Sequence, residues 1–447
     1  MTNDPMNTDR SKEEPVIVEF FSEEALENIM ALLTYKPERI IYLGHKHNMI
    51  TKKMNSLRRF AGLTSPHTTL EFIEVPRDDL MLCIQTIEDI LTDHPHARFE
   101  LTGGGEMFLI AFGYVSANRK VDTLRIDPYT GTEMDLSSGH LPTTTHTNAS
   151  ITVSENIVLH GGTLRPQLFR WDFDELFREE IQEIWTVAKR LGHNWNRYCS
   201  IIEEVIKNYP EDAEHVFRLP KAALKDSITL LQQLKDKGMM DFYRSEKHCI
   251  VFRFANQQIR EVVTKTGNIL ELHVYEVATR EPTIFTDATT GAIIDWEGQP
   301  VQQESAFSDG HPKGETINEI DVILMRDAVP TFISCKSGRA DSKALHELET
   351  VTSRFGGRYA KKVLVMATPC EAAASGGAFF KQRAKDMHIW VIDDCYNLTD
   401  DQLMRKLQRI QGAERAQYGN VNIPKRRYTK RGRASNPMSY SQVCLSS

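Results

Sequence analysis

The sequence predicts an α/β protein of several domains: an N-terminal doubly wound sheet, a small helical segment and a C-terminal α/β domain. Short apolar runs alternate with segments of helical spacing over residues 16–135, and a similar mixture returns from residue 256 onward. Strands that alternate with helices form mostly parallel sheets with helices on both faces. A chain of 447 residues is also too long for one core, so two or three domains are expected.

The composition is that of a water-soluble protein, with 40% hydrophobic and 26% charged residues. No apolar run reaches the roughly 18 residues that a membrane span needs, and the N-terminus lacks an apolar signal core. The seven cysteines are scattered without metal-site spacing, which is typical of reduced thiols. We therefore expect a cytoplasmic protein. The net charge of −7 argues against broad coating by nucleic acid but leaves a local basic groove open.

The N-terminal part reads as five strands and four helices in alternation. Strands are predicted at residues 16–21, 39–45, 70–76, 98–101 and 123–128, and helices near 22–33, 48–62, 78–92 and 106–118. Ser22 is a suitable N-cap for the first of these helices. Ligands of such sheets bind beyond the carboxyl ends of the strands.

A glycine run lies at one of these strand ends. Thr102, Gly103, Gly104 and Gly105 join a predicted strand to a predicted helix. Glycines let backbone N–H groups approach a phosphate, and a helix N-terminus favours anions. From these residues alone, a tight turn without a ligand is an equally good interpretation. Ser22 follows the first strand and should lie at the same end of the sheet.

The middle of the chain changes character. Residues 150–172 look like a linking segment, and 174–254 carry three helices followed by a strand, a turn and a strand. The helices are predicted near residues 174–190, 194–208 and 219–237. This order is typical of a winged-helix module, but a helical connector between the flanking domains fits equally well. The supposed recognition helix has four lysines and no arginine, a weak signal for DNA reading.

The C-terminal part mixes helices with a prominent hairpin. We expect a helix from residue 256, strands near 283–301, two strands over 318–338, a helix at 342–355 and buried strands at 361–369 and 388–394. The tail at 412–447 includes the basic stretch 425–433 and is expected to be disordered.

The hairpin carries an acid and a lysine on one face. Asp321 lies on its first strand, and Ser334 and Lys336 lie on its second; strand side chains alternate between faces. A carboxylate can hold Mg²⁺ or Mn²⁺, and a lysine can orient a water or offset developing charge. The residues therefore suit metal-dependent phosphodiester hydrolysis. A solvated salt bridge is the alternative interpretation.

This arrangement resembles the core of the PD-(D/E)XK nuclease superfamily, whose pattern is Asp, a gap, then (Asp/Glu)-x-Lys. Asp321 matches the first position and Lys336 the last, while Ser334 stands where a carboxylate is usual. The Ser334 hydroxyl could hold a metal-bound water. The Cys335 carbonyl could be an oxygen ligand, and Glu319 could replace the missing carboxylate.

Glu271 is the third candidate of this site. It lies between Leu270 and Leu272 in an apolar helical stretch, where an acid is costly unless it is paired or bound to a metal. The superfamily often places a glutamate on the helix before the core strands, and Glu271 matches that position.

With both halves considered, the chain resembles the CRISPR ancillary nucleases that join a CARF sensor domain to a PD-(D/E)XK nuclease domain. The resemblance covers about residues 15–395 and rests on VIVEFFSEEALENI, ERIIYLG, LTGGGEM, KTGNILELHVYE, NEIDVILMRDAVPTFISCKSG and HELETVTSRFGGRYAKKVLV. It implies a Rossmann-like CARF domain at 15–150, a winged-helix-like segment at 174–254 and a restriction-endonuclease-like domain at 255–397.

The resemblance also implies a function. A homodimer would bind a cyclic oligoadenylate, usually the tetra-adenylate, and then cut DNA or RNA with Mn²⁺ or Mg²⁺ in type III CRISPR defence. The implied ligand contacts are Ser22, Thr102, Gly103, Gly104 and Gly105. The implied catalytic residues are Glu271, Asp321, Ser334 and Lys336, with Glu271, Asp321 and Cys335 at the metal.

Two other functions stay open at this point. One is a ligand-sensing transcription regulator built on the sensor domain and a winged helix. The other is a ring nuclease, in which the N-terminal domain degrades the cyclic oligoadenylate itself.

Overall fold

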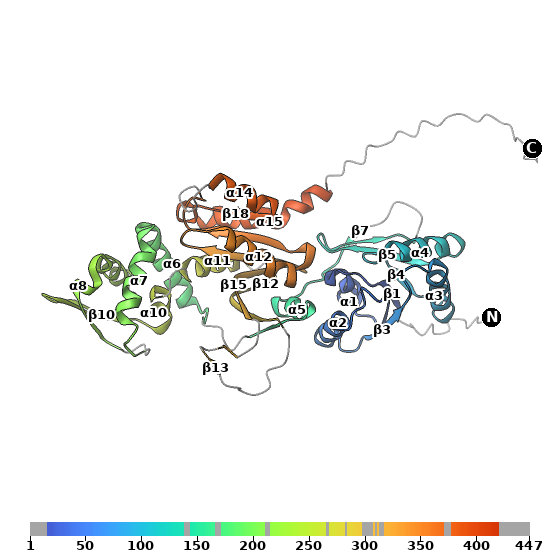
Figure 1. The fold of residues 1–447 in the computed structure, drawn as a ribbon, viewed down its shortest axis with the longest axis horizontal. Helices are drawn as coiled ribbons and strands as arrows, with labels where there is room; N and C mark the ends of the chain where they lie inside the picture. Colours follow the sequence, from blue (N-terminus) through green and yellow to red (C-terminus); the bar gives the residue numbers. More distant parts are fainter. Residues whose placement is uncertain are drawn as a thin grey trace, which may run out of the picture.

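The computed structural model describes residues 16–137, 144–165, 171–210, 215–264, 268–281, 284–296, 307–308, 311–312, 317–370 and 377–419. The predicted α/β class is confirmed: in this part of the chain, the strands form sheets of seven, six, three and two strands, with helices packed against them. Figure 1 shows the C-terminal sheet in the centre, between the N-terminal sheet and the middle segment. The order of the parts in space therefore differs from their order in the sequence.

The N-terminal sheet has the strand order β3-β2-β1-β4-β5-β6-β7. Its strands are β1 Ile17–Phe20, β2 Arg39–Gly44, β3 Thr69–Glu74, β4 Arg98–Glu100, β5 Asp122–Asp127, β6 Thr132–Asp135 and β7 Thr144–His146. The first five are parallel and match the predicted strands, whereas the antiparallel pair β6 and β7 was not predicted. The helices of this part are α1 Met30–Tyr35, α2 Thr51–Thr64, α3 Leu80–Asp93 and α4 Glu106–Asn118.

The first helix begins later than predicted, and Ser22 does not cap it. A short 3₁₀ turn, η1 Ala25–Asn28, precedes α1, and Glu24 occupies the N-cap position of that turn. The side chain of Asn28 accepts a hydrogen bond from the Ser22 N–H at 2.7 Å and donates one to the Ser22 carbonyl at 3.0 Å. These bonds close a loop over residues 22–28, which takes the place of the first helical turns.

The C-terminal sheet has the order β18-β17-β16-β15-β12-β8. Its strands are β8 Thr163–Leu164, β12 Asp287–Asp295, β15 Ile317–Arg326, β16 Val329–Lys336, β17 Lys361–Met366 and β18 Ile389–Ile392. The predicted hairpin is confirmed, with Val322 opposite Ile333. Helix α12 Ser342–Phe355 has the predicted bounds and joins β16 to the parallel strand β17, and α14 Gly377–Asp386 precedes β18. The pair β13 Phe307–Ser308 and β14 His311–Pro312 forms the two-stranded sheet.

Two helical predictions need correction. The helix expected from residue 256 is divided into α10 Gln257–Thr264 and α11 Asn268–Thr279, with residues 265–267 outside the described part. Helix α15 Asp400–Gly419 extends through residues 412–419, where the tail was expected to begin. Its apolar residues Leu403, Leu407 and Ile410 enter the core and hold the first part of this helix. Residues 420–447, with the basic stretch 425–433, lie outside the described residues.

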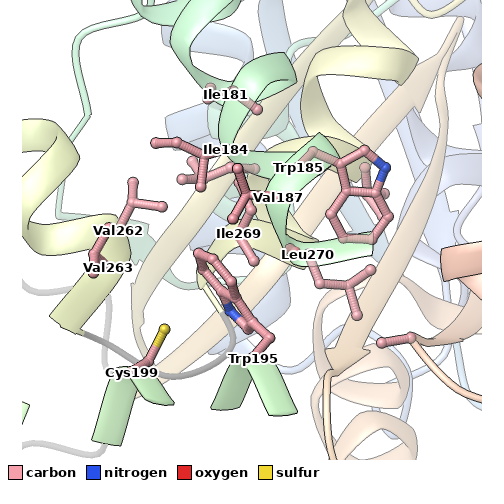
Figure 2. Close-up of a cluster of buried hydrophobic side chains, with 14 of the residues drawn as sticks. Ile181, Ile184, Trp185, Val187, Trp195, Cys199, Val262, Val263, Ile269 and Leu270 are labelled. Atoms are coloured by element: carbon pink, nitrogen blue, oxygen red, sulfur yellow. The ribbon is translucent and has the colours of Figure 1, made fainter. Parts of the chain in front are cut away.

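The middle segment has the order of elements of a winged helix. Its elements are α6 Glu175–Leu191, α7 Asn194–Ile206, β9 Phe217–Pro220, α8 Lys221–Leu224, η3 Lys225–Ser227, α9 Ile228–Asp236, β10 Met240–Ser245 and β11 Cys249–Phe254. The three strands pair in the order β10-β11-β9. This arrangement favours the winged-helix interpretation over a helical connector. Figure 2 shows how it is attached: Ile184 and Trp185 of α6 lie beside Leu270 of α11 in one apolar cluster.

Helix α5 Val153–Leu159 lies in the segment that was predicted to be a link. Its buried residues Ile157 and Leu159 belong to the same apolar core as Tyr42 of β2 and Phe355 of α12. Figure 1 shows α5 at the junction of the two large sheets. The N-terminal and C-terminal sheets therefore share one continuous core. In the described residues, no helix is long and apolar enough to cross a membrane.

Arg165 and Asp295 fasten the edge strand that follows α5. Their side chains form a salt bridge between the end of β8 and the end of β12, and they are only 6% and 1% exposed. Removal of one partner leaves the other charge buried, so we expect Arg165→Ala to lower the free energy of unfolding by about 3–5 kcal/mol. Denaturant unfolding measures this loss. Arg39→Ala, at an exposed pair with Glu71, should cost less than about 1 kcal/mol. Equal losses of unfolding free energy in the two variants would contradict a stabilising role for the buried salt bridge between Arg165 and Asp295.

Candidate ligand pocket and candidate active site

Ser22 lies at the carboxyl end of β1, where it is held by several hydrogen bonds. Its hydroxyl donates to Glu27 Oε2 at 2.5 Å and accepts from the Glu24 N–H at 3.1 Å. The glycine run lies directly beside it, because a Cβ placed on Gly103 would be only 2.8 Å from the Ser22 Cβ. The structure thus brings together Ser22 and the run from Thr102 to Gly105, as the sequence predicted.

The glycines of this run differ in the space around them. Gly104 has a φ of +101°, and a Cβ there would lie 2.2 Å from the Phe20 Cβ. A side chain at Gly104 would therefore disturb the fold itself. A Cβ on Gly105 would meet the His45 ring at ordinary contact distance, 3.7 Å. Gly105 is also the N-cap of α4, so the helix N-terminus opens beside it.

Ser22, Gly104 and Gly105 line a cavity of about 330 Å³ at the carboxyl ends of the N-terminal strands. The other residues around this cavity are Glu23, Glu24, His45, His47, Asn48, Arg77, Glu106, Met107 and Arg358. Thr102 is not among the lining residues because its hydroxyl donates to the Ile126 carbonyl at 2.7 Å and also lies against Glu100. Thr102 therefore supports the loop from behind.

Charges of both signs surround the cavity. Arg77 follows β3, whereas Arg358 comes from the C-terminal part of the chain, after α12. His45 stacks on Phe108 at a centroid distance of 4.5 Å, and its Nδ1 lies 2.9 Å from the Val75 carbonyl oxygen. Since a carbonyl only accepts, the Nδ1–H donates this bond, and in a neutral ring Nε2 is then an acceptor. The arginines of this cavity can bind anionic groups, and its glutamates can accept hydrogen bonds from donors of a ligand.

Two buried glutamates lie under the glycine loop. Glu19 and Glu100 are adjacent across β1 and β4, and each is about 1% exposed. Burial raises the pKa of Glu100 to about 7, although hydrogen bonds from Thr102 and from the Ile126 N–H lower it. Burial and the charge of Glu100 raise the pKa of Glu19 well above its usual range. Neither oxygen of the Glu19 carboxyl has a hydrogen-bond partner among the described residues.

In the C-terminal sheet, Asp321 lies just beyond the last pair of the β15–β16 ladder. Its Oδ2 accepts from the Cys335 N–H at 2.5 Å and from the Ser334 hydroxyl at 3.2 Å. Burial raises the pKa of Asp321, while the Cys335 bond, the Lys336 charge and the Ser334 bond lower it, and Glu319 raises it further. The structure therefore brings Asp321, Ser334 and Lys336 together, with Glu319 within electrostatic reach.

Glu271 lies on the other side of this hairpin. It is 8% exposed on α11, a helix that packs on β15 and β16. Burial raises the pKa of the Cys335 thiol well above its usual range, and the charges of Asp321 and Glu271 contribute to this rise. The Cys335 side chain packs against the core on the α11 side. Glu271 therefore approaches the site from the Cys335 side, not from the Asp321 side.

The fit to a divalent cation depends on oxygen ligands. Within the described residues, no three His, Cys, Asp or Glu side chains are grouped so that they could hold a metal. The donor set is instead two neighbouring carboxylates, Asp321 and Glu319, with the Ser334 hydroxyl beside them. Burial is the largest cause that raises the pKa of Asp321, and the charge of Lys336 lowers it. The oxygen atoms of Asp321, Glu319 and Ser334 are of the kind that Mg²⁺ and Mn²⁺ prefer as ligands.

Sequence reasoning missed two contacts because they join distant parts of the chain. Asn196 of α7 donates to the Ser337 hydroxyl at 3.0 Å, so the winged-helix-like segment touches the residue after Lys336. Arg358 reaches the N-terminal pocket from the end of α12. Only the position of Arg358 had a sequence signal. Arg358 follows Gly356-Gly357, and such a pair marks the end of a helix and lets the backbone come close to another segment.

The pKa of Glu100 makes stability depend on pH. Unfolded Glu100 loses its proton from about pH 4.5, but folded Glu100 keeps it to about pH 7, so stability falls as pH rises between these values. In the wild type, Glu100 should lower the free energy of unfolding by about 3 kcal/mol between pH 5 and pH 8. We expect this fall to be absent in Glu100→Gln. Chemical unfolding at the two pH values tests this, with Glu71→Gln as the exposed control. An unchanged pH dependence in Glu100→Gln would show that another group causes it.

The chain was compared with known proteins. No family model matches it, and no curated protein matches it. Solved structures share its fold, among them two that it matches over most of both chains. Protein VC1899 from Vibrio cholerae has a TM-score of 0.69 and 16% identity, with 89% of this chain and 98% of that chain covered. Can2 from Sulfobacillus thermosulfidooxidans, solved in complex with cyclic tetra-adenylate, has a TM-score of 0.63, 17% identity and the same coverage. This chain therefore has the fold of VC1899 and Can2 over nearly nine tenths of its length.

Proposed function

We propose that this protein is a metal-dependent nuclease, activated by a cyclic oligoadenylate, that cuts DNA or RNA in type III CRISPR defence. The observation that carries the proposal is the shared fold with Can2, which was solved with cyclic tetra-adenylate. Two local features support it. One is the pocket beside Ser22 and the glycine loop, and the other is the face that carries Asp321 and Lys336.

The N-terminal pocket suits a phosphate-bearing ligand. The N-terminus of α4 and the close-packed glycines offer backbone N–H groups, and Arg77 and Arg358 add positive charge. Glu23, Glu24 and Glu106 also line the cavity, and Glu24 already accepts a hydrogen bond from the Arg358 N–H. A negative ligand would therefore bind at Gly105 and the arginines. Cyclic tetra-adenylate is the specific ligand that we propose.

The ligand also makes a homodimer the proposed assembly, because a ring of repeated nucleotides can use the same loop twice across a two-fold axis. Exposed apolar side chains gather on α3 and α4, the helix that begins at the pocket. They are Met81, Leu82, Leu109, Ile110 and Tyr114. Helices α3 and α4 pack side by side, so these residues form a surface next to the ligand. A second copy of this chain is the proposed occupant.

In the C-terminal site, Lys336 and Asp321 have distinct roles. Asp321 and Glu319 would hold Mg²⁺ or Mn²⁺, with the Cys335 carbonyl as a further oxygen donor. Such an ion lowers the pKa of a bound water and polarises the phosphate. Lys336, whose charge already acts on Asp321, would orient the attacking water and offset the charge that develops on the phosphate. Ser334 keeps the Asp321 carboxylate in place through its hydroxyl.

Glu271 is the remaining acid of the proposed site. It lies behind Cys335, within electrostatic reach of that residue. Asp321 and Glu319 would hold the metal together with the Cys335 carbonyl, and Glu271 would add negative charge to the site.

One observation favours a second function, that of a ligand-sensing DNA-binding regulator: the elements from β9 to β11 have the order of a winged helix. EDTA, which removes divalent metal, distinguishes the two proposals. A regulator binds DNA without metal and does not cut it, whereas a nuclease cuts only after metal is restored. The contact between Asn196 and Ser337 instead joins this segment to the residue after Lys336, which supports a role in holding the substrate.

The central experiment incubates labelled DNA and RNA with the protein, with and without cyclic tetra-adenylate and Mn²⁺. We expect cleavage only when both are present. Lys336→Ala should lower the cleavage rate by about 10²–10³ because one electrostatic stabiliser is lost, and calorimetry should show unchanged ligand binding. Lys343→Ala, at an exposed pair with Glu347, is the matched control. Wild-type turnover by Lys336→Ala would rule out this active site.

The metal ligands can be tested by titration. Asp321→Asn and Glu271→Gln each remove a negative oxygen that a hard cation prefers, so both should raise the Mn²⁺ concentration that gives half-maximal cleavage. Manganese binding, followed by calorimetry without substrate, gives a second readout that does not depend on turnover. Glu347→Gln on the exposed side of α12 is the control. Unchanged midpoints in both variants would remove these residues from the metal site.

A further inference from the structure

The loop between α12 and β17 docks on the N-terminal sheet beside the pocket. Gly357 has a φ of +58°, and a Cβ there would lie 2.5 Å from Glu24 Oε2. A glycine is therefore needed for this close approach. The Arg358 N–H donates to the same oxygen at 3.0 Å. The backbone of this loop is thus fixed against the first turn that follows β1.

Glu27 is the shared acceptor of this junction. Its Oε1 accepts from the guanidinium of Arg358 and from the Tyr359 hydroxyl, and its Oε2 accepts from the Ser22 hydroxyl. Glu27 is 4% exposed, whereas the Arg358 side chain is 62% exposed. One buried carboxylate therefore connects a residue of the ligand pocket to a cation that solutes can reach.

Arg358 and Ser22 line the same cavity. A phosphate group in that cavity would compete with Glu27 for the guanidinium, which binds phosphate oxygens in pairs. Arg77 also lines the cavity, but it follows β3 of the N-terminal sheet. Arg358 is the pocket arginine contributed by the C-terminal part of the chain.

We propose that Arg358 is a ligand-binding residue that exchanges its buried partner Glu27 for a phosphate of the ligand and so reports occupancy to the C-terminal sheet. This inference rests on the proposed function. Two residues separate Arg358 from the start of β17. Strand β17 pairs with β16 in the register that places Met366 beside Lys336. A ligand that binds one position of this loop more tightly than the other shifts the equilibrium between the two arrangements.

Variants at the two partners should act in opposite directions. Arg358→Gln should weaken binding of cyclic tetra-adenylate about tenfold or more, because a charge-assisted contact is lost, and Arg358→Lys should restore part of the affinity. Glu27→Gln should tighten binding, because the competing charge is removed while an oxygen acceptor for Ser22 stays. Calorimetry measures these affinities. Arg39→Gln, at an exposed pair on the far end of β2, should leave them unchanged.

Cleavage gives a second readout. At saturating ligand, Arg358→Gln should show a smaller ratio of ligand-dependent to ligand-independent cleavage than the wild type, and thermal unfolding verifies that each variant is folded. Wild-type affinity in Arg358→Gln overturns the inference, as does weaker binding in Glu27→Gln, which would indicate a structural role for the pair. These results leave the proposed function intact. If the wild type itself binds no cyclic tetra-adenylate, both the proposed function and this inference fail.

Discussion

The apolar core around α5 is the constraint on which the rest of the structure depends. Helix α5 packs against α2 of the N-terminal part and against β8, β12 and β15 of the C-terminal sheet. Its residues Ile157 and Leu159 belong to the core that both parts share, so the two parts cannot turn independently without exposing that core. The core fixes the distance between the end of β1 and the end of α12. Only in that position can Arg358 meet Glu27. An ion pair contributes little at a solvated surface, but one that includes a buried carboxylate is sensitive to any change in its surroundings.

Much of the architecture was predictable because it follows from local periodicity. The parallel strands of the N-terminal sheet, the hairpin at residues 318–338 and α12 all have the expected positions. The acid–lysine face was predictable for the same reason, since strand side chains alternate. The contact of Glu27 with Arg358 spans 331 residues, and no local pattern in a single sequence encodes a pair at that separation. Helix α5 was missed because its few residues lie within a segment that resembles a link.

The two candidate sites differ in the sign of the charge that each is proposed to bind. At the hairpin, Asp321 and Glu319 lie within electrostatic reach of each other, and the proposed cation would offset their negative charge. At the pocket, the proposed anionic ligand would approach a surface that includes several glutamates. Two further glutamates lie buried beneath this surface: Glu27 accepts hydrogen bonds from Ser22, Tyr359 and Arg358, and Glu100 accepts them from backbone N–H groups and has a raised pKa. A protein can thus place carboxylates beneath an anion site when each carboxylate has its own donors or its own proton.

The shared core also affects how the chain is made. Helix α5 ends at Leu159, but the C-terminal strands and α12 that cover it extend to about Met366. At ordinary translation speeds of about 5–20 residues per second, roughly 10–40 s separate the synthesis of α5 from that of its partners. During that interval, α5 can pack only on the N-terminal part, chiefly on α2. The nascent chain therefore exposes apolar surface, and a polypeptide truncated before β15 should be prone to aggregation.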